Sequence, residues 1–192
     1  MEGERFAKSD DGTSFPGAAR AELKGGNVPI RFPIKTARLT IRPMRLDDAE
    51  ALLAVYGDLE TMQHLSANLP ATVAEAREWV QTKIARFDRD DQLSLWTVML
   101  TESGQIVGDV GLQHEDYGSG PVVGLGGRGN REFWRKGLGL EAASATIAAG
   151  FEQLDLPAIG AETDPKICQS KHCSASWGCG RLARTPTDGR FT

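Results

Sequence analysis

Hydrophobic and polar positions repeat with two different periods in the first half of the chain, and they predict one strand followed by two helices. Residues 37–42 alternate apolar and polar side chains, which is typical of a half-buried strand that stops at Pro43. A capping-box pattern at residues 47–50 precedes a first helix. A second such pattern at residues 72–75 precedes apolar positions at helical spacing, which predict a long helix to about Phe87.

The second half of the chain predicts four further strands and one further helix. Residues 93–100 and 105–112 are strand-like on either side of a Glu-Ser-Gly turn, which indicates a hairpin. Residues 121–125 and 158–163 predict two more strands. Between them lies a helix whose core face we expect to consist of Leu140, Ala143, Ile147, Phe151 and Leu154. The order β-α-α-β-β-β-α-β predicts an α+β fold with a mixed sheet.

The composition fits one soluble domain with a tail. The chain has 192 residues, 40% hydrophobic and 25% charged, which supports one core. Residues 1–35 are polar without a sustained period and predict a flexible arm. A net charge of −4 gives no reason to expect broad nucleic-acid binding. Because no apolar run approaches the roughly 20 residues of a membrane helix, and no signal peptide is apparent, we expect a cytoplasmic protein.

The stretch ahead of the last predicted helix combines bulky, basic and glycine residues, in the order Phe-Trp-Arg-Lys-Gly-Leu-Gly over residues 133–139. The first N–H groups of a helix have no intrahelical partner, and the helix dipole adds partial positive charge there. Gly137 and Gly139 let a ligand approach the backbone closely, and Arg135 and Lys136 add charge. These residues predict a cradle for an anion such as a phosphate or pyrophosphate. A plain loop ahead of a core helix explains the local residues equally well.

Two further patterns suggest sites that we discount. Residues 124–129 spell G-x-G-x-x-G, but residues 130–134 follow instead of a helix, and hairpin signals precede it, which argues against a dinucleotide loop. All three cysteines fall in the last 25 residues together with one histidine, at Cys168, His172, Cys173 and Cys179. Their spacing is not C-x-x-C and no second pair exists, so we expect no metal site.

Taken in order, these motifs resemble the GCN5-related N-acetyltransferases (GNAT), and within them the ribosomal-protein-type enzymes. The first strand of that subgroup is similar to residues 36–43, Thr-Ala-Arg-Leu-Thr-Ile-Arg-Pro, and an acidic helix cap follows it. Its acetyl-CoA loop runs aromatic-Trp-Gly-basic-Gly-x-Ala-x-Glu-Ala. Residues 133–142 match this loop, with Arg135 and Gly139 replacing small residues. Residues 161–165, Ala-Glu-Thr-Asp-Pro, match the strand that follows it.

The resemblance covers about residues 34–166 and implies a GNAT-like, mostly antiparallel sheet flanked by helices, in a domain that we place at residues 36–166. It implies acetyl-CoA as the co-substrate, with its pyrophosphate on the backbone amides from Lys136 through Leu138 to Gly139. The acceptor would be a primary amine on a protein N-terminus or a small molecule. The resemblance leaves monomer and homodimer open.

The resemblance also implies that the strands at residues 122–125 and 159–163 splay apart to hold pantetheine and the acceptor amine. Such an acyl transfer needs a base for the ammonium, an amide donor for the thioester carbonyl, and often an acid for the thiolate. Related enzymes commonly carry an acidic and an aromatic residue where this chain has Gly124 and Gly127. The remaining candidates near the cleft are His114, Glu115, Asp116 and Glu162. We assign no catalytic base from the sequence.

The resemblance stops after residue 166. The family continues with a helix that carries two leucines, then Leu-Gly-Phe or Leu-Gly-Met and two final strands, whereas residues 167–180 show neither a helical stripe nor strand alternation. When each codon is taken one nucleotide earlier, the tail is compatible with Asn-Leu-Pro-x-x-Ala-Leu-Leu-x-x-Leu-Gly-Met, which is the missing helix. We therefore hypothesise that residues 167–192 are a frameshifted, disordered tail, and that the last helix and two strands are absent.

Three functions remain open from the sequence. The first is an acetyl-CoA-dependent N-acetyltransferase. The second is a non-catalytic remnant that still binds CoA but has lost the chemistry through the tail, in a chain of weak stability. The third, a dinucleotide-binding oxidoreductase, rests on the glycine run alone.

Overall fold

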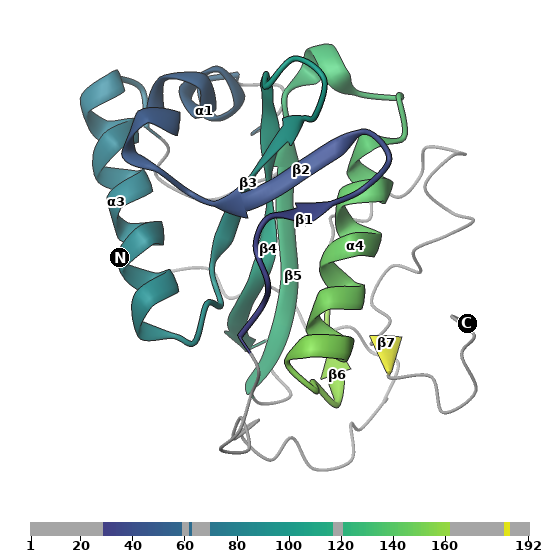
Figure 1. Cartoon of the computed structure of the whole chain (residues 1–192). Coiled ribbons are helices and arrows are strands. Elements are labelled where there is room, and N and C mark those ends of the chain that lie inside the picture. Colours follow the sequence, from purple (N-terminus) through teal and green to yellow (C-terminus); the bar gives the residue numbers. More distant parts are fainter. Residues whose placement is uncertain (1–28, 59–61, 63–69, 117–120, 162–182, 185–192) are drawn as a thin grey trace, which may run out of the picture.

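The computed structural model describes residues 29–58, 62, 70–116, 121–161 and 183–184 (Figure 1). A five-stranded antiparallel sheet has the order β1-β2-β3-β4-β5. Its strands are β1 (Ile34–Lys35), β2 (Leu39–Pro43), β3 (Leu95–Leu100), β4 (Ile106–Asp116) and β5 (Pro121–Gly129). A second, two-stranded sheet pairs β6 (Ala158–Ile159) with β7 (Ala183–Arg184). The α+β class and the mostly antiparallel sheet are confirmed.

Helices cover the two faces of the large sheet. The helical elements are η1 (Leu46–Asp48), α1 (Ala49–Tyr56), α3 (Val73–Arg89), η2 (Arg131–Phe133) and α4 (Leu138–Gln153). Figure 1 shows α1 and α3 on one side of the strands and α4 on the other. The core is correspondingly divided into a larger cluster that includes α4 and a smaller cluster that joins α1 and α3 to Leu95.

The predicted helix starts are correct in place, but the predicted capping box forms only at α3, since α1 has no side-chain cap. Thr72 accepts a hydrogen bond from the Glu75 amide at 3.2 Å, as the capping-box pattern predicts. At the first helix, Asp48 rather than Asp47 is the buried acid, and it accepts the Arg45 amide at 2.8 Å. Burial acts to raise the pKa of Asp48, but hydrogen bonds, led by those from Arg42, bring it below its usual value.

The core face of α4 agrees with the prediction in part, because Ile147 and Leu154 are buried and Phe151 packs against the core. Leu140 is 46% exposed, whereas the buried positions are Leu138, Ala142, Thr146, Ile147, Ala149 and Gly150. A Cβ on Gly150 would lie 2.8 Å from Ile159 Cδ1, so the helix backbone approaches the β6 side chains closely. The sequence pattern favours the large apolar residues as the buried stripe. The helix turns small residues toward the sheet beside Leu138 and Ile147, which leaves Leu140 on the outside.

Both predicted terminal segments overlap the fold. Residues 29–35, assigned above to the flexible arm, contain the buried Ile30 and strand β1. Phe32 contacts the Trp96 ring edge-on at 5.0 Å, which fixes this segment to the core. Within the predicted tail, the described residues 183–184 form β7. Residues 1–28, 162–182 and 185–192 lie outside the described part.

The long β4–β5 hairpin contains the glycine run of residues 124–129. Its register runs from Gly108 opposite Gly129 to Asp116 opposite Pro121. The G-x-G-x-x-G run is therefore part of strand β5, and a strand cannot supply the loop that a dinucleotide fingerprint requires.

Candidate functional site

The outer edge of β5 is paired for only a short distance. Gly124 forms a parallel bridge with Gly160, in which the Leu125 amide donates to the Gly160 carbonyl at 2.7 Å and the Gly160 amide to Val123 at 2.9 Å. Beyond this bridge, Gly127 is exposed and has no partner on that edge among the described residues. Because strand amides alternate in direction, the Gly127 N–H faces the open edge, as the Leu125 N–H does.

The opening thus begins later along β5 than predicted. The sequence placed the splayed part of the strand at residues 122–125, but those residues carry the bridge to Gly160. The open part is residues 126–129, which lead directly into the predicted cradle. The bridge to Gly160 lies near the middle of β5, and the strand is unpaired on this edge only after the bridge, in the residues that lead into η2.

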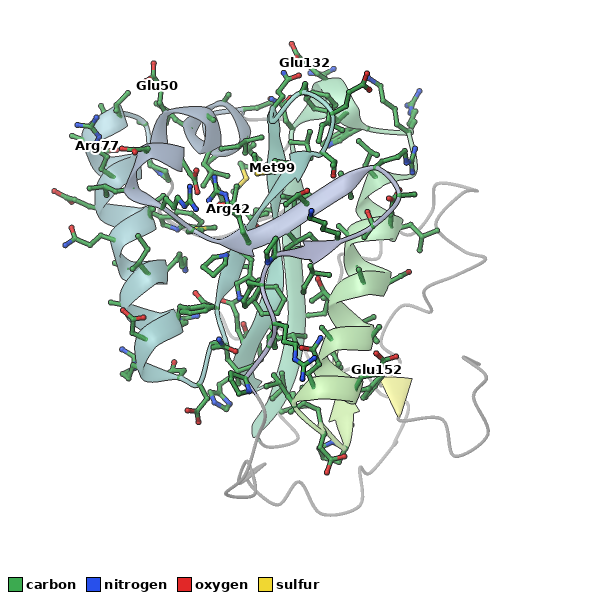
Figure 2. All side chains as sticks on the ribbon, in the orientation of Figure 1. Arg42, Glu50, Arg77, Met99, Glu132 and Glu152 are labelled. Atoms are coloured by element: carbon green, nitrogen blue, oxygen red, sulfur yellow. The ribbon has the colours of Figure 1, made fainter. Side chains whose placement is uncertain are left out.

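The predicted cradle folds back against the end of β5. Asn130 caps η2 by accepting the Glu132 amide at 3.0 Å, and Trp134 Nε1 donates to the Gly129 carbonyl at 2.8 Å. Figure 2 shows Glu132 beside this loop, at the opposite end of the molecule from Glu152 near the end of α4. The loop therefore connects the open part of β5 directly to the start of α4.

The start of α4 presents backbone N–H groups without partners. Gly137 is the N-cap with φ +74°, a left-handed conformation that glycine adopts without strain. The first helical hydrogen bond runs from the Glu141 amide to the Gly137 carbonyl at 3.1 Å. In the described part of the chain no acceptor meets the amides of residues 138–140. A Cβ on Gly139 would meet no atom within 4 Å, so the space beside these amides is open.

The two basic residues of the cradle are both exposed. Lys136 Nζ lies 5.0 Å from the centroid of the Phe133 ring, a cation–π contact within the loop. Arg135 has φ +61°, which is unusual for a residue with a side chain. This is the position at which the related loop has glycine. The structure therefore brings the five predicted residues, 135–139, together around one helix N-terminus that is suited to an anion.

A second polar group lies inside the protein, on the sheet face that α1 and α3 cover. The Tyr56 hydroxyl donates to Asp109 Oδ2, and the Arg128 guanidinium lies 5.6 Å above the Tyr56 ring. Both Asp109 Oδ1 and Arg128 Nε are buried without a hydrogen-bond partner. Burial raises the pKa of Asp109 to about 6, against the lowering effect of Arg128, Tyr56 and Lys83. We call Tyr56, Asp109 and Arg128 the buried triad.

The acids and the histidine nominated from the sequence lie away from the cradle. His114 and Glu115 stand opposite Val123 and Val122, on the far side of the Gly124 bridge from the open edge. Asp116 lies at the end of β4, and Glu162 is outside the described residues. Asp109, opposite Arg128, is on the cradle side of the bridge. Asp109 was not among the candidates from the sequence, although an acidic residue within a mostly apolar strand could have indicated it.

The described residues contain neither a metal-ligating cluster nor a membrane-spanning helix. These residues bring no three metal-ligating side chains together, and the tail cysteines lie outside them. No helix in the described ranges is long and apolar enough to span a membrane.

An antiparallel sheet that opens beside a helix N-terminus is an α+β arrangement suited to an anionic ligand. A family model described as an acetyltransferase (GNAT) domain matches residues 38–178. The chain therefore belongs to the GNAT acetyltransferase family.

Similar proteins agree with this assignment. Over 131 residues the chain is 29% identical to the uncharacterized N-acetyltransferase p20 of Bacillus licheniformis, covering 68% of this chain and 72% of that protein. A solved GNAT acetyltransferase from Bacillus anthracis is 26% identical, with a TM-score of 0.61 over 73% of this chain and 78% of its own. A proposed ribosomal-protein-serine acetyltransferase from Vibrio cholerae is 25% identical, with a TM-score of 0.62 over 76% and 82%.

Proposed function

We propose that the protein is an acetyl-CoA-dependent N-acetyltransferase that acts on a primary amine. One observation carries the proposal: the open part of β5 leads into the unpartnered amides at the start of α4 through a short loop that Trp134 ties to Gly129. The first feature suits a pyrophosphate and the second suits an extended chain that needs a backbone partner. The residues present fit the co-substrate, because Gly139 leaves open space there and Arg135 and Lys136 add positive charge.

The chain's own groups would act as follows. The amides of residues 138–140, with Arg135 and Lys136, would bind the pyrophosphate. The Gly127 N–H would donate to the thioester carbonyl and stabilise the charge that develops on its oxygen. Acetyl-CoA supplies the activated acetyl group. The amine must lose a proton, and we assign no residue to accept it, because Asp109 and Tyr56 are buried and His114 lies beyond the bridge.

The acceptor is an amine on a protein N-terminus or on a small molecule. The likeness to the proposed ribosomal-protein-serine acetyltransferase supports a protein N-terminus as the first acceptor to test. Peptides that match the N-termini of ribosomal proteins therefore belong in the substrate panel, beside small polyamines and amino-acid amides.

The test has two stages on the full chain. Titration calorimetry should show saturable heat with acetyl-CoA and none with NADH, since β5 offers no dinucleotide loop. Thiol release in the presence of the amine panel should then depend on both acetyl-CoA and one class of amine. Heat with NADH alone would contradict the proposal. Release that is independent of every amine would show hydrolysis instead of transfer.

The second candidate is a remnant that binds CoA without transferring the acetyl group. The tail favours it, because residues 167–192 do not continue the family pattern, although the family match itself extends to residue 178. Acetyl-CoA binding without thiol release for any amine would support this candidate. Resequencing the gene tests its origin: DNA that cannot encode the missing helix in the neighbouring frame would remove the frameshift hypothesis.

A further inference from the structure

We propose that Arg38 is a positioning residue for the cofactor loop, and that it allows an acidic residue to stand beside an anion site by neutralising Glu141. The inference rests on the proposed function, since it concerns acetyl-CoA binding. It joins two motifs that lie far apart in the sequence, the start of β2 and the start of α4. Neither the motif resemblance nor the family match assigns this role to the pair.

Arg38 contacts the cradle at two points. Its Nη1 donates to the Lys136 carbonyl at 2.8 Å, and its Nε donates to Glu141 Oε2 at 2.6 Å. The Arg38 backbone amide also donates to Glu141 Oε1 at 2.9 Å. The same residue therefore holds the carbonyl of the residue before the N-cap and the acid in the first turn of the helix.

The other end of this contact is fixed to the sheet. Thr36 Oγ1 donates to Glu141 Oε1 at 2.6 Å and accepts from the Leu39 amide at 2.9 Å. The Thr36 amide donates to the Leu39 carbonyl at 2.9 Å, and the Leu39 side chain is fully buried. The turn between β1 and β2 is thus a fixed support. Its hydrogen bonds to Glu141 hold the cradle loop, although the two segments are about 100 residues apart in the sequence.

The bond to Lys136 sets the direction of a peptide plane. In a trans peptide the carbonyl and the following N–H point in opposite directions. When Arg38 binds the Lys136 carbonyl, the Gly137 N–H must point away from Arg38. A flip of this plane would turn the negative end of the carbonyl toward the cradle, where it would oppose an anionic ligand.

The charge of Glu141 makes the pairing necessary. Hydrogen bonds from Thr36, and then from Arg38, lower the pKa of Glu141, so it is ionised at neutral pH. A carboxylate in the first helical turn stabilises the helix but repels a bound pyrophosphate. Arg38, whose side chain is 49% exposed, supplies the neutralising charge at 2.6 Å. Without it, the cradle would hold an unpaired anion.

This arrangement predicts an unusual rescue. We expect Arg38→Ala to raise KM for acetyl-CoA about fivefold to tenfold, with kcat changed by less than about twofold, because uniform binding is lost. Adding Glu141→Gln should bring KM back at least about threefold, since the repelling charge is removed. The matched control is Arg89→Ala, because Arg89 makes a similar two-point contact with Asp90 away from the cradle, at 2.7 and 3.0 Å. It should leave KM unchanged. A double variant no better than Arg38→Ala would overturn the inference.

Amide hydrogen exchange gives a second readout that needs no ligand. The amide of Glu141, which donates to the Gly137 carbonyl at 3.1 Å, should exchange faster in Arg38→Ala than in the wild type, and Arg89→Ala should not change it. If the wild type binds no acetyl-CoA but shows this difference, the proposed function fails while the positioning of the loop stands. Unchanged exchange together with unchanged KM would overturn the positioning role itself.

Discussion

The cradle and the buried triad are both polar, but the chain builds them in opposite ways. The cradle consists of consecutive residues, 133–139, and its main groups are backbone amides exposed to solvent. The buried triad joins three separate elements: Tyr56 ends α1, Asp109 lies on β4 and Arg128 lies on β5. The cradle residues are consecutive in the sequence, and Arg38 ties them to the sheet, whereas the triad residues come together only once the sheet and the helices have packed.

The two regions should therefore affect different properties, ligand binding for the cradle and folding stability for the buried triad. A cradle of exposed amides costs little to form, because water satisfies the same groups when no ligand is bound. The triad instead places a carboxyl group where burial raises its pKa to about 6 and leaves one of its oxygens unpartnered. We therefore expect substitutions in the cradle to change ligand affinity, and substitutions in the triad to change the pH dependence of folding.

The largest effect is expected from Asp109→Asn. The folded-state pKa of about 6 lies above the usual value of 3.8, so the native state binds this proton more tightly than the unfolded state. The unfolding free energy of the wild type should then fall as pH rises from about 4 to 6 and stay lowered above it, by up to about 3 kcal/mol. Asparagine keeps an acceptor for Tyr56 but does not titrate. The variant should gain this difference at pH 8 and none at pH 4, by urea denaturation.

Tyr56→Phe provides the matched test of direction. The tyrosine hydroxyl lowers the pKa of Asp109 by its hydrogen bond, so removing it should raise the folded-state pKa and extend the fall in stability to a higher pH, with its onset unchanged. If Asp109→Asn and the wild type differ equally at pH 4 and pH 8, the buried triad does not titrate as described. The comparison between the two regions would then lose its main support.

A smaller effect, confined to binding, is expected from Gly139→Asp. The side chain enters the open space beside the free amides and places a carboxylate where the pyrophosphate would lie. Acetyl-CoA affinity should fall about tenfold to hundredfold in calorimetry, because like charges oppose each other there. Thermal stability should be equal or slightly higher, since an acid in the first turn favours the helix.

Gly139→Ala is the matched control for this position. Its methyl group meets no atom within 4 Å, and alanine is the residue that the related loop carries there. It should keep acetyl-CoA affinity within about twofold, and alanine in place of helical glycine should stabilise the protein by about 0.5–1 kcal/mol. An equal loss of affinity in both variants would show that bulk, not charge, decides, and would argue against an anion site.

The same contrast explains what could be predicted from the sequence. Strands β2 to β5, the long helix and the cradle follow from periods, caps and glycines that are adjacent in the chain, and the structure has them within a few residues, whereas β1 was not predicted. The core face of α4 could not be predicted in this way, because it depends on how closely Gly150 approaches Ile159. The residue pattern predicts that the largest apolar side chains are buried. Packing of a helix on a sheet also depends on the shapes of the two surfaces, so small residues are buried where the backbones approach closely.

The site was predictable to the extent that it is local. Residues 135–139 gather where expected, but the Arg38 contact with Glu141 joins positions 103 apart. The buried triad joins Tyr56 to Asp109 across 53 positions. Neither pairing has a sequence pattern, since both depend on the strand register and on how the helices pack on the sheet.

The smallest effect concerns the backbone of the cradle. Arg135 has φ +61°, a conformation that costs a residue with a Cβ roughly 1–2 kcal/mol. Arg135→Gly should therefore raise the unfolding free energy by about 1 kcal/mol, less the entropy that glycine loses on folding. Acetyl-CoA affinity should fall only slightly, because Lys136 and the amides remain.

Arg135→Ala separates strain from charge, since it removes the guanidinium but keeps a Cβ. It should show the same slight loss of affinity without the gain in stability, as measured by urea denaturation and calorimetry on one preparation. A glycine variant no more stable than the alanine variant would mean that the left-handed conformation costs this loop nothing. The cradle would then be a looser structure than its hydrogen bonds to Arg38 and Gly129 indicate.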